Sequence, residues 1–154
     1  MAFYYLDTSA LVKLYVREPG TERLLGLAAR SSENRLAILA LAQIEFRSAI
    51  RRRERNGEIP SLVATQLLEA FGRHVAGRFL TQTVTGFVLD TACTLVDRHA
   101  LRAFDAVQLA GYMVLKSAGG TDMPVFVCSD QELLMAAKRE GAAVLDPVTE
   151  SQEP

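Results

Sequence analysis

The stretch that decides the fold is the N-terminal sequence MAFYYLDTSAL, residues 1–11. Its apolar, aromatic-rich run, residues 2–6, ends abruptly at Asp7, and Thr8 and Ser9 follow before the chain turns apolar again. A short uncharged run of this kind is typical of a strand buried on both faces of a parallel sheet. Because ligands of open α/β sheets bind where the carboxyl ends of the strands emerge, Asp7 stands where a functional carboxylate is expected. The alternative is that Asp7 only caps the helix that follows.

The length and composition indicate one globular domain. The 154 residues are enough to bury a core without help from disulfides or metal, and 49% hydrophobic with 23% charged residues excludes a disordered chain. We expect the domain to span residues 1–147 and residues 148–154 to form a loose C-terminal tail. The two cysteines, Cys93 and Cys128, form no zinc or redox motif, so both are predicted to be reduced core thiols.

Charge and hydropathy limit the partners and the location of the protein. The formal net charge of −1 gives no global positive field of the kind that marks many nucleic-acid binders, so a nucleic-acid contact must be local. The N-terminal apolar run lacks a basic flank and reaches Asp7 too early for a signal peptide, and no later run is long enough to span a bilayer. We therefore expect a cytoplasmic protein without a membrane partner.

Strand patterns and helix patterns alternate from the start of the chain to its end. Strands are predicted at residues 2–6, 35–39, 79–84, 123–128 and 142–145. Helices are predicted at residues 9–16, 21–30, after 39 up to the stop signal at 56–57, from 60 to 72–77, at 86–99, from 101 to 119–120, and from 130 to 141. Such alternation implies right-handed crossovers and a mostly parallel sheet between two layers of helices, so the fold class is α/β.

Two further acids fall inside apolar helical patterns. Glu45 has apolar or small residues one turn away on either side, which places its carboxylate on a core-facing stripe. Because burying an unpaired charge is expensive, the alternatives are a salt bridge to Arg47 or Arg51, or a stripe that is less buried than its pattern suggests. Asp105 lies in the first turns of the most apolar helix of the chain, where the helix dipole alone would stabilise its charge.

A fourth acid, Asp130, repeats the arrangement of Asp7. It follows the predicted buried strand at residues 123–128, at the point where the strand turns into a helix. Like Asp7, it can be read as a simple helix N-cap.

Arginines gather at the end of the second long helix. Arg51, Arg52 and Arg55 there, together with Arg102 shortly before Asp105, are candidates for RNA contact, because the planar guanidinium suits bidentate phosphate binding. The alternative is a solvated helix end where cations complement the helix dipole.

The four acids would meet at one edge of the sheet. Carboxylates that converge without a lysine or histidine in their motifs repel one another unless a cation neutralises them. Ligands that offer only oxygen select a hard ion, Mg²⁺ or Mn²⁺. Such ions also bind substrate phosphate and activate water, which makes phosphodiester hydrolysis the expected chemistry.

Four stretches carry a resemblance to a known family: YLDTSAL at residues 5–11, Glu45 in its helix, LRAFDAVQLA at residues 101–110, and VCSD at residues 127–130. Together they resemble the motifs of PIN-domain nucleases, and within these the VapC toxins of prokaryotic type II toxin–antitoxin systems. The resemblance spans nearly the whole chain, with the acids in the family's order. One departure is Gln108, since many relatives carry histidine three residues after the third acid. Another is that no Ser or Thr marks the start of the Glu45 helix.

The resemblance implies a three-layer α/β/α fold around a five-stranded parallel sheet with strand order 3-2-1-4-5. It also implies Mg²⁺- or Mn²⁺-dependent cleavage of RNA, homodimerisation, and inhibition by a VapB-type antitoxin. Carried over by position, Asp7, Glu45, Asp105 and Asp130 would be the catalytic, metal-binding acids. Ser9 would stabilise the metal site indirectly.

Two other functions fit part of the pattern. A PIN-like module without turnover would bind RNA or a protein partner, although acids at all four positions argue against it. A phosphoacceptor of the receiver kind also places an aspartate at a strand end beside Mg²⁺ but requires a lysine after a late strand, which Ser129 and Asp130 do not offer.

Overall fold

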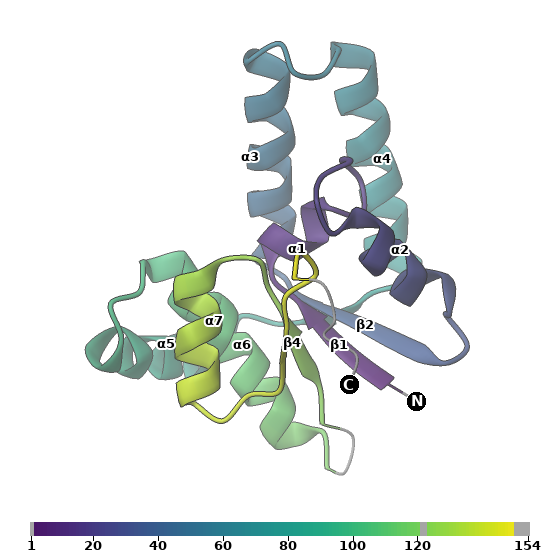
Figure 1. Ribbon diagram of the computed structural model, residues 1–154. Helices are drawn as coiled ribbons and strands as arrows, with labels where there is room; N and C mark the ends of the chain where they lie inside the picture. Colours follow the sequence, from purple (N-terminus) through teal and green to yellow (C-terminus); the bar gives the residue numbers. More distant parts are fainter. Residues whose placement is uncertain (1, 121–122, 150–154) are drawn as a thin grey trace.

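The computed structural model of the chain describes residues 2–120 and 123–149 (Figure 1). Five strands in this part form one parallel sheet with the order β3-β2-β1-β4-β5. They are β1 (Ala2–Leu6), β2 (Asn34–Leu39), β3 (Leu80–Gln82), β4 (Val125–Val127) and β5 (Val144–Leu145). The predicted fold class, the parallel sheet and its strand order are thereby confirmed.

The central strand β1 is buried on both faces, as its sequence predicts. It pairs with β2 on one side and β4 on the other, so that Tyr5 lies opposite both Ala37 and Phe126. Successive side chains point to opposite faces of a strand. Accordingly, Tyr5 packs into the core on one face of the sheet, and Leu6 packs into the core on the other.

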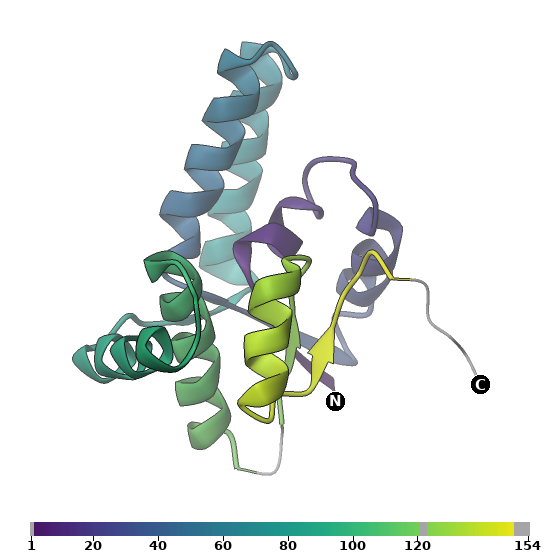
Figure 2. The same ribbon diagram turned by 60° about the vertical axis from the view of Figure 1, so that its left-hand side comes forward.

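Helices cover both faces of the sheet (Figures 1 and 2). The layer that packs on the face of Leu6 consists of α1 (Thr8–Val12), α2 (Thr21–Ala29), α3 (Ala42–Arg55) and α4 (Ser61–Gly77). The layer on the face of Tyr5 consists of α5 (Gly86–Arg98), α6 (Ala103–Ala118) and α7 (Gln131–Arg139). Each layer has its own apolar core, and the sheet lies between them.

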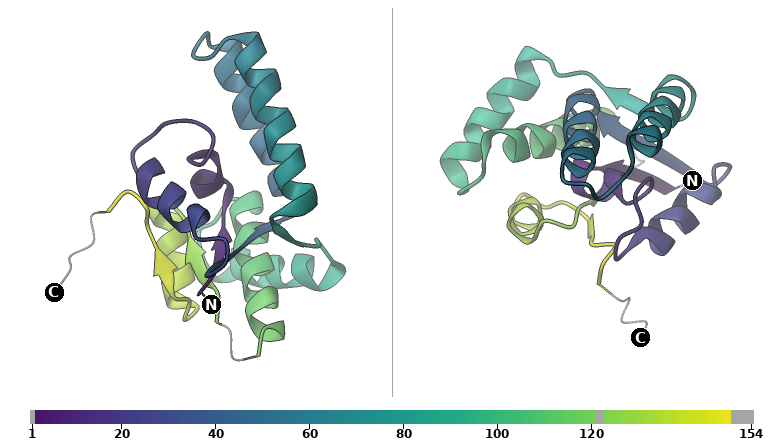
Figure 3. Two further views of the ribbon diagram at one scale, coloured as in Figure 1. Left: turned by 90° about the vertical axis from the view of Figure 1, so that its right-hand side faces the viewer. Right: turned by 90° about the horizontal axis from the view of Figure 1, so that it is seen from above.

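The helices α3 and α4 form a hairpin that projects away from the sheet, which Figure 3 shows from two further sides. The hairpin is connected to the segment between α1 and α2 by charged side chains. Glu18 in this segment accepts from Lys13 Nζ at 3.0 Å and also pairs with Arg53 of α3. Lys13 is only 7% exposed, so this network lies partly inside the protein and fixes the hairpin relative to α1.

Helix α6 approaches the sheet very closely at Gly111. The Tyr5 hydroxyl donates a hydrogen bond of 3.0 Å to the backbone carbonyl of Gln108, one turn earlier in the same helix. A Cβ atom on Gly111 would lie 2.5 Å from the Tyr5 hydroxyl oxygen and 2.6 Å from Leu39 Cδ1. Glycine is therefore required here by the distance between helix and strands, not by a special backbone conformation.

Several predicted boundaries differ from the structure. The first helix, predicted at residues 9–16, begins one residue earlier at Thr8, because Asp7 caps it, and ends at Val12. Three strands are shorter than predicted: β3 spans Leu80–Gln82, β4 spans Val125–Val127 and β5 spans Val144–Leu145. Of these, β3 and β5 are edge strands, which pair on one side only, so fewer of their residues meet the hydrogen-bond pattern of a strand.

The prediction that both cysteines are core thiols is wrong for Cys93. Cys128 is buried, but Cys93 is exposed on α5. The buried face of that helix is formed by Val88, Ala92 and Leu95, and a residue directly after Ala92 turns away from this face.

Two expectations concern the chain end and the membrane. Of the predicted loose tail, residues 150–154 lie outside the described residues, while the Thr149 carbonyl accepts a hydrogen bond of 2.9 Å from Arg23. Within residues 2–120 and 123–149, no helix has the length and apolar character needed to cross a membrane.

Candidate functional site

The predicted acids lie at the carboxyl edge of the sheet, each on a different element. Asp7 follows β1 and is the N-cap of α1, and Asp130 follows β4 by three residues and is the N-cap of α7. Glu45 lies in the first turn of α3, and Asp105 lies in the first turn of α6. The cap interpretation of Asp7 and Asp130 is therefore correct, and it does not exclude a functional role, because capping uses only one oxygen of each carboxylate.

Asp7 is the most buried of the acids, with an exposed fraction of 4%. Its Oδ1 accepts hydrogen bonds from the Ser9 hydroxyl at 2.7 Å and from the Ala10 backbone N–H at 3.0 Å. Its Oδ2 accepts from the Cys128 thiol at 3.3 Å. Burial raises the pKa of Asp7 from 3.8 to about 6, although the hydrogen bonds from Ser9, Ala10 and Cys128 work in the opposite direction.

Glu45 is held by polar neighbours and not by an arginine. Its Oε1 accepts from the Thr8 hydroxyl at 2.9 Å and from Gln108 Nε2 at 2.7 Å. Gln108 Nε2 also donates to Thr8 Oγ1 at 3.0 Å. The alternative, a salt bridge from Glu45 to Arg47 or Arg51, is not found among the described residues. Arg51 pairs instead with Glu54 at 2.8 Å, three residues later on α3.

The remaining two acids share one cation. Asp105 Oδ2 accepts from Arg102 Nε at 3.2 Å, and Asp130 Oδ2 lies 3.7 Å from Arg102 Nη2. The other oxygen of Asp130, Oδ1, caps α7 by accepting from the Leu133 N–H at 3.1 Å. Burial raises the pKa of Asp105, the charge of Arg102 lowers it, and the negative charge of Asp130 raises it further.

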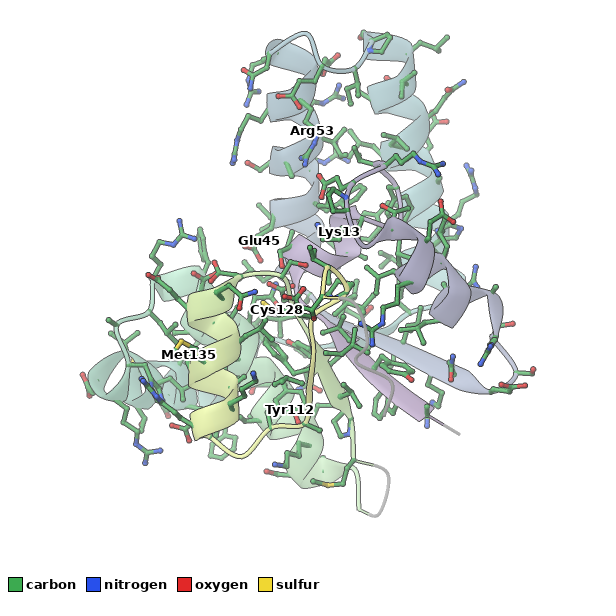
Figure 4. All side chains as sticks on the ribbon, viewed as in Figure 1. Lys13, Glu45, Arg53, Tyr112, Cys128 and Met135 are labelled. Atoms are coloured by element: carbon green, nitrogen blue, oxygen red, sulfur yellow. The ribbon has the colours of Figure 1, made fainter. Side chains whose placement is uncertain are left out.

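Shared partners connect the four acids into one group. Thr8, the residue after Asp7, donates to Glu45. The sulfur of Cys128 donates to Asp7 and accepts from the backbone N–H of Asp130 at 3.3 Å. Arg102 then joins Asp130 to Asp105. Figure 4 shows the labelled Glu45, at the base of α3, on the same side of the molecule as Cys128 at the end of β4.

The side chains as they lie do not form a ready-made metal site. In the described part of the chain, no three Asp, Glu, His or Cys residues are grouped closely enough to hold an ion. The donors nevertheless suit a hard cation, because all four are carboxylates. No hydrogen bond within the described residues reaches Glu45 Oε2 or Asp105 Oδ1, and Asp7 Oδ2 accepts only a weak thiol donor. Each of these acids thus keeps an oxygen that a cation can use.

Ser9 lies where it can orient Asp7. Its hydroxyl donates to Asp7 Oδ1 and accepts from the Ser129 backbone N–H at 3.0 Å, so it joins the loops after β1 and β4.

Sequence reasoning did not find three residues of this group. These residues are Thr8, Cys128, which the sequence predicts as a core thiol, and Gln108, which stands out in the sequence only as a departure from a motif. A signal existed for Gln108, which lies three residues after Asp105 and therefore one turn further along the same helix. It is buried, with an exposed fraction of 2%, and its Oε1 has no hydrogen-bond partner among the described residues.

The arginines predicted to contact RNA are at different distances from the acids. Arg102 touches two of them. Arg52 and Arg55 are exposed and lie seven and ten residues after Glu45 on α3, which corresponds to roughly 10 and 15 Å along the helix axis. Arg51 is held by Glu54. Arg51, Arg52 and Arg55 therefore lie along the projecting hairpin, and of the four predicted arginines only Arg102 lies at the acids.

Comparisons with known proteins place this arrangement in a family. Among solved structures, a protein from Pyrobaculum aerophilum, PAE2754, is 26% identical over 93% of this chain and 83% of its own, with a TM-score of 0.62. A toxin–antitoxin complex from Klebsiella pneumoniae (15% identity, 94% and 97% covered, TM-score 0.62) and VapBC2 from Rickettsia felis bound to a promoter DNA fragment (13%, 93% and 97%, TM-score 0.60) share the fold.

A search of curated proteins found no match. The scan of protein families matches residues 4–111 to the PIN domain, a segment that includes three of the four acids and more than half of the chain. With the parallel sheet in the order 3-2-1-4-5 and the acids at its carboxyl edge, this match shows that the chain belongs to the PIN-domain family.

Proposed function

We propose that the protein is a metal-dependent endoribonuclease that acts as the toxin of a VapC-type toxin–antitoxin pair. The observation that supports this most is the connected group of four carboxylates, which come from four different elements and meet at one edge of the sheet. A purely structural set of helix caps does not require Glu45, which caps nothing and is nevertheless held by two hydrogen bonds.

Asp7, Glu45, Asp105 and Asp130 would hold Mg²⁺ or Mn²⁺, with Ser9 acting through Asp7. When bound, such an ion would stabilise negative charge on a phosphodiester and lower the pKa of a water molecule so that it can attack phosphorus. The partners of the acids maintain the geometry. The hydrogen bonds from Ser9 and Ala10 hold Oδ1 of Asp7, so that its Oδ2 faces the thiol of Cys128. Glu45 is held by the hydrogen bonds from Thr8 and Gln108.

The raised pKa of Asp7 agrees with this role. A carboxylate with a pKa of about 6 is only partly protonated near neutral pH, and a cation beside it would favour the ionised form. The burial that raises this pKa also lowers the local dielectric, which strengthens the attraction between the carboxylate and a divalent ion.

RNA would approach the acids along the projecting hairpin. Exposed Arg52 and Arg55 on α3 can contact phosphates of a segment that flanks the cleavage site, and Arg51 can do so if it leaves Glu54. Arg102 stands at the acids themselves. The arginines provide the local positive charge that a protein with a net charge of −1 needs for nucleic-acid binding.

The proposed protein partners follow from the relatives. Several similar structures are toxin–antitoxin complexes, so we propose a VapB-type antitoxin as partner, a homodimeric toxin and a cytoplasmic location. Large apolar side chains exposed on the chain, among them Leu62 and Phe87, are available for such contacts. Co-expression with the product of a small open reading frame directly upstream, followed by size-exclusion chromatography with light scattering, tests both assemblies.

The nuclease itself is tested with purified full-length protein and single-stranded and hairpin RNA in Mn²⁺ or Mg²⁺. Asp7→Asn and Asp105→Asn should each abolish cleavage, as should EDTA, whereas Asp90→Asn, which changes an exposed acid on α5, should leave it unchanged. Cleavage that persists in either site variant, or in EDTA, would show that the carboxylates do not perform the reaction.

A further outcome separates the enzyme from a binding module. An inactive PIN-like domain would bind RNA or its partner without cleaving RNA under any metal condition. Calorimetry with Mn²⁺ would then show no saturable binding that depends on Asp105.

A further inference from the structure

Arg102 occupies a position that the proposed reaction does not by itself require. Its guanidinium lies between two of the four acids, with Nε 3.2 Å from Asp105 Oδ2 and Nη2 3.7 Å from Asp130 Oδ2. It is the cation that balances these two carboxylates in the arrangement described. The negative charge of Glu132 also acts on Asp105. The three carboxylates Asp105, Asp130 and Glu132 therefore outnumber the one positive charge of Arg102.

The Arg102 side chain is 84% exposed. Within the described residues, its only hydrogen bonds and ion pairs are those to the two carboxylates. Arg102 is the N-cap residue of α6, but its side chain makes no capping hydrogen bond. A role in packing or in helix capping therefore does not account for the position of the guanidinium.

The contact is strong enough to place the arginine and weak enough to be displaced. Exposed ion pairs change affinities or stabilities by only a small factor, up to about fivefold for a single pair. A divalent ion carries twice the charge and bonds directly to carboxylate oxygens. Competition between the two cations at Asp105 and Asp130 would thus favour the metal, while Arg102 lowers its apparent affinity.

We propose that Arg102 is an exchangeable counter-ion of the Asp105–Asp130 pair, which the metal displaces and which then binds a phosphate of the RNA at the site. The proposal rests on the proposed function and adds an order of events to it. The arginine bonds to carboxylates before the metal binds and to substrate afterwards. The long side chain and its exposed position beside the acids allow both contacts without a change of the backbone.

The proposal predicts effects of opposite sign on two ligands, which a merely structural role would not produce. Arg102→Gln removes the competing charge, so it should bind Mn²⁺ about two- to fivefold more tightly than the wild type in calorimetry without RNA. With saturating Mn²⁺, the same variant should show a higher KM for single-stranded RNA. In a plot of the logarithm of RNA affinity against the logarithm of salt concentration, the slope for this variant should be shallower by about 0.7, the value for one lost phosphate contact.

The chain offers a matched control. Arg17 has the same exposed fraction of 84% and also pairs with a carboxylate at 2.7 Å, but its partner is Glu22, which is not one of the four acids. Arg17→Gln should leave both Mn²⁺ binding and KM unchanged. Arg102→Lys keeps the charge and should bind Mn²⁺ like the wild type, while thermal melting verifies that each variant is folded.

The outcomes distinguish this inference from the function on which it rests. If the wild type binds Mn²⁺ and Arg102→Gln binds it equally or more weakly, the exchange is refuted while the nuclease proposal stands. If Mn²⁺ binding tightens but KM and the salt dependence do not change, the phosphate contact is refuted. If the wild type fails to bind Mn²⁺ at all, both the proposed function and this inference are overturned.

Discussion

Replacing Gly111 by alanine tests the close approach of α6 to the sheet. In an open helix interior this substitution stabilises a protein, since alanine is more favourable than glycine by about 1 kcal/mol. At Gly111 the new Cβ would lie 2.5 Å from the Tyr5 hydroxyl oxygen and 2.6 Å from Leu39 Cδ1, distances that carbon atoms do not adopt without movement. Either the helix or one of these two side chains must shift.

Neither side chain can move cheaply. Tyr5 and Leu39 are completely buried, and the ring of Tyr5 packs against Tyr112 and Phe126 at centroid distances of 5.8 and 5.9 Å. Forcing an extra methyl group into a filled core costs about 1–3 kcal/mol, and weakening the bond from Tyr5 to the Gln108 carbonyl costs roughly 1 kcal/mol more. After subtraction of the helix-propensity gain, Gly111→Ala should lower the free energy of unfolding by about 2 kcal/mol. In a domain of this size the melting temperature should fall by about 4–8 °C.

Urea titration and thermal melting measure this effect, with Gly72→Ala as the control. Gly72 also lies inside a helix, but nothing is within 4 Å of its added Cβ, so that variant should be up to about 1 kcal/mol more stable than the wild type. Tyr5→Phe combined with Gly111→Ala should recover part of the loss, because the phenylalanine lacks the oxygen that the methyl group meets. Equal stabilisation by both glycine substitutions would refute the close approach.

Two further predictions concern the charges at the site. Gln108→Glu would place a carboxylate against Glu45, where the amide now donates at 2.7 Å, and should lower the free energy of unfolding at pH 7.5 by about 1–3 kcal/mol and by much less at pH 5. In the exposed control Gln131→Glu, the new carboxylate would likewise face an acid, Asp146, and stability in urea titrations should change by less than about 1 kcal/mol. A loss of stability in Gln108→Glu that does not depend on pH would contradict the reasoning. The folded protein raises the pKa of Asp7 from 3.8 to about 6, so folding binds a proton in this pH range. The stability of the metal-free protein should therefore fall by about 2 kcal/mol as the pH rises from 4 to 7. Asp7→Asn should remove that fall in EDTA, and a wild-type curve parallel to that of the variant would exclude the raised pKa.

The succession of strands and helices along the chain could be predicted because local sequence patterns determine it. The apolar run before Asp7, the helix stop at residues 56–57 and the glycines after α6 and α7 each act within a few neighbouring residues. Strand ends were less accurate, since the length of β3 and β5 depends on which neighbouring strand they meet. Exposure of Cys93 depends similarly on the exact rotation of α5 against the sheet.

The positions of the acids were predictable, but their partners were not. Asp7, Glu45, Asp105 and Asp130 each stand out in the sequence as polar residues at the border of an apolar pattern. The bond from Gln108 to Glu45 joins residues 63 positions apart, and the orientation of an amide follows from the packing of two helices. Nearness in the sequence likewise offers Arg47 or Arg51 only as alternative partners of Glu45, whereas in the structure Arg51 pairs with Glu54.

The four acids come from four elements that are far apart in the chain. Asp7 meets the Cys128 thiol, 121 positions later in the chain, only after β4 has been added beside β1. A chain that ends before β4 and α7 lacks Asp130 and also lacks the Cys128 thiol, which joins Asp130 to Asp7. The group of four acids is therefore complete only after these two elements have been added.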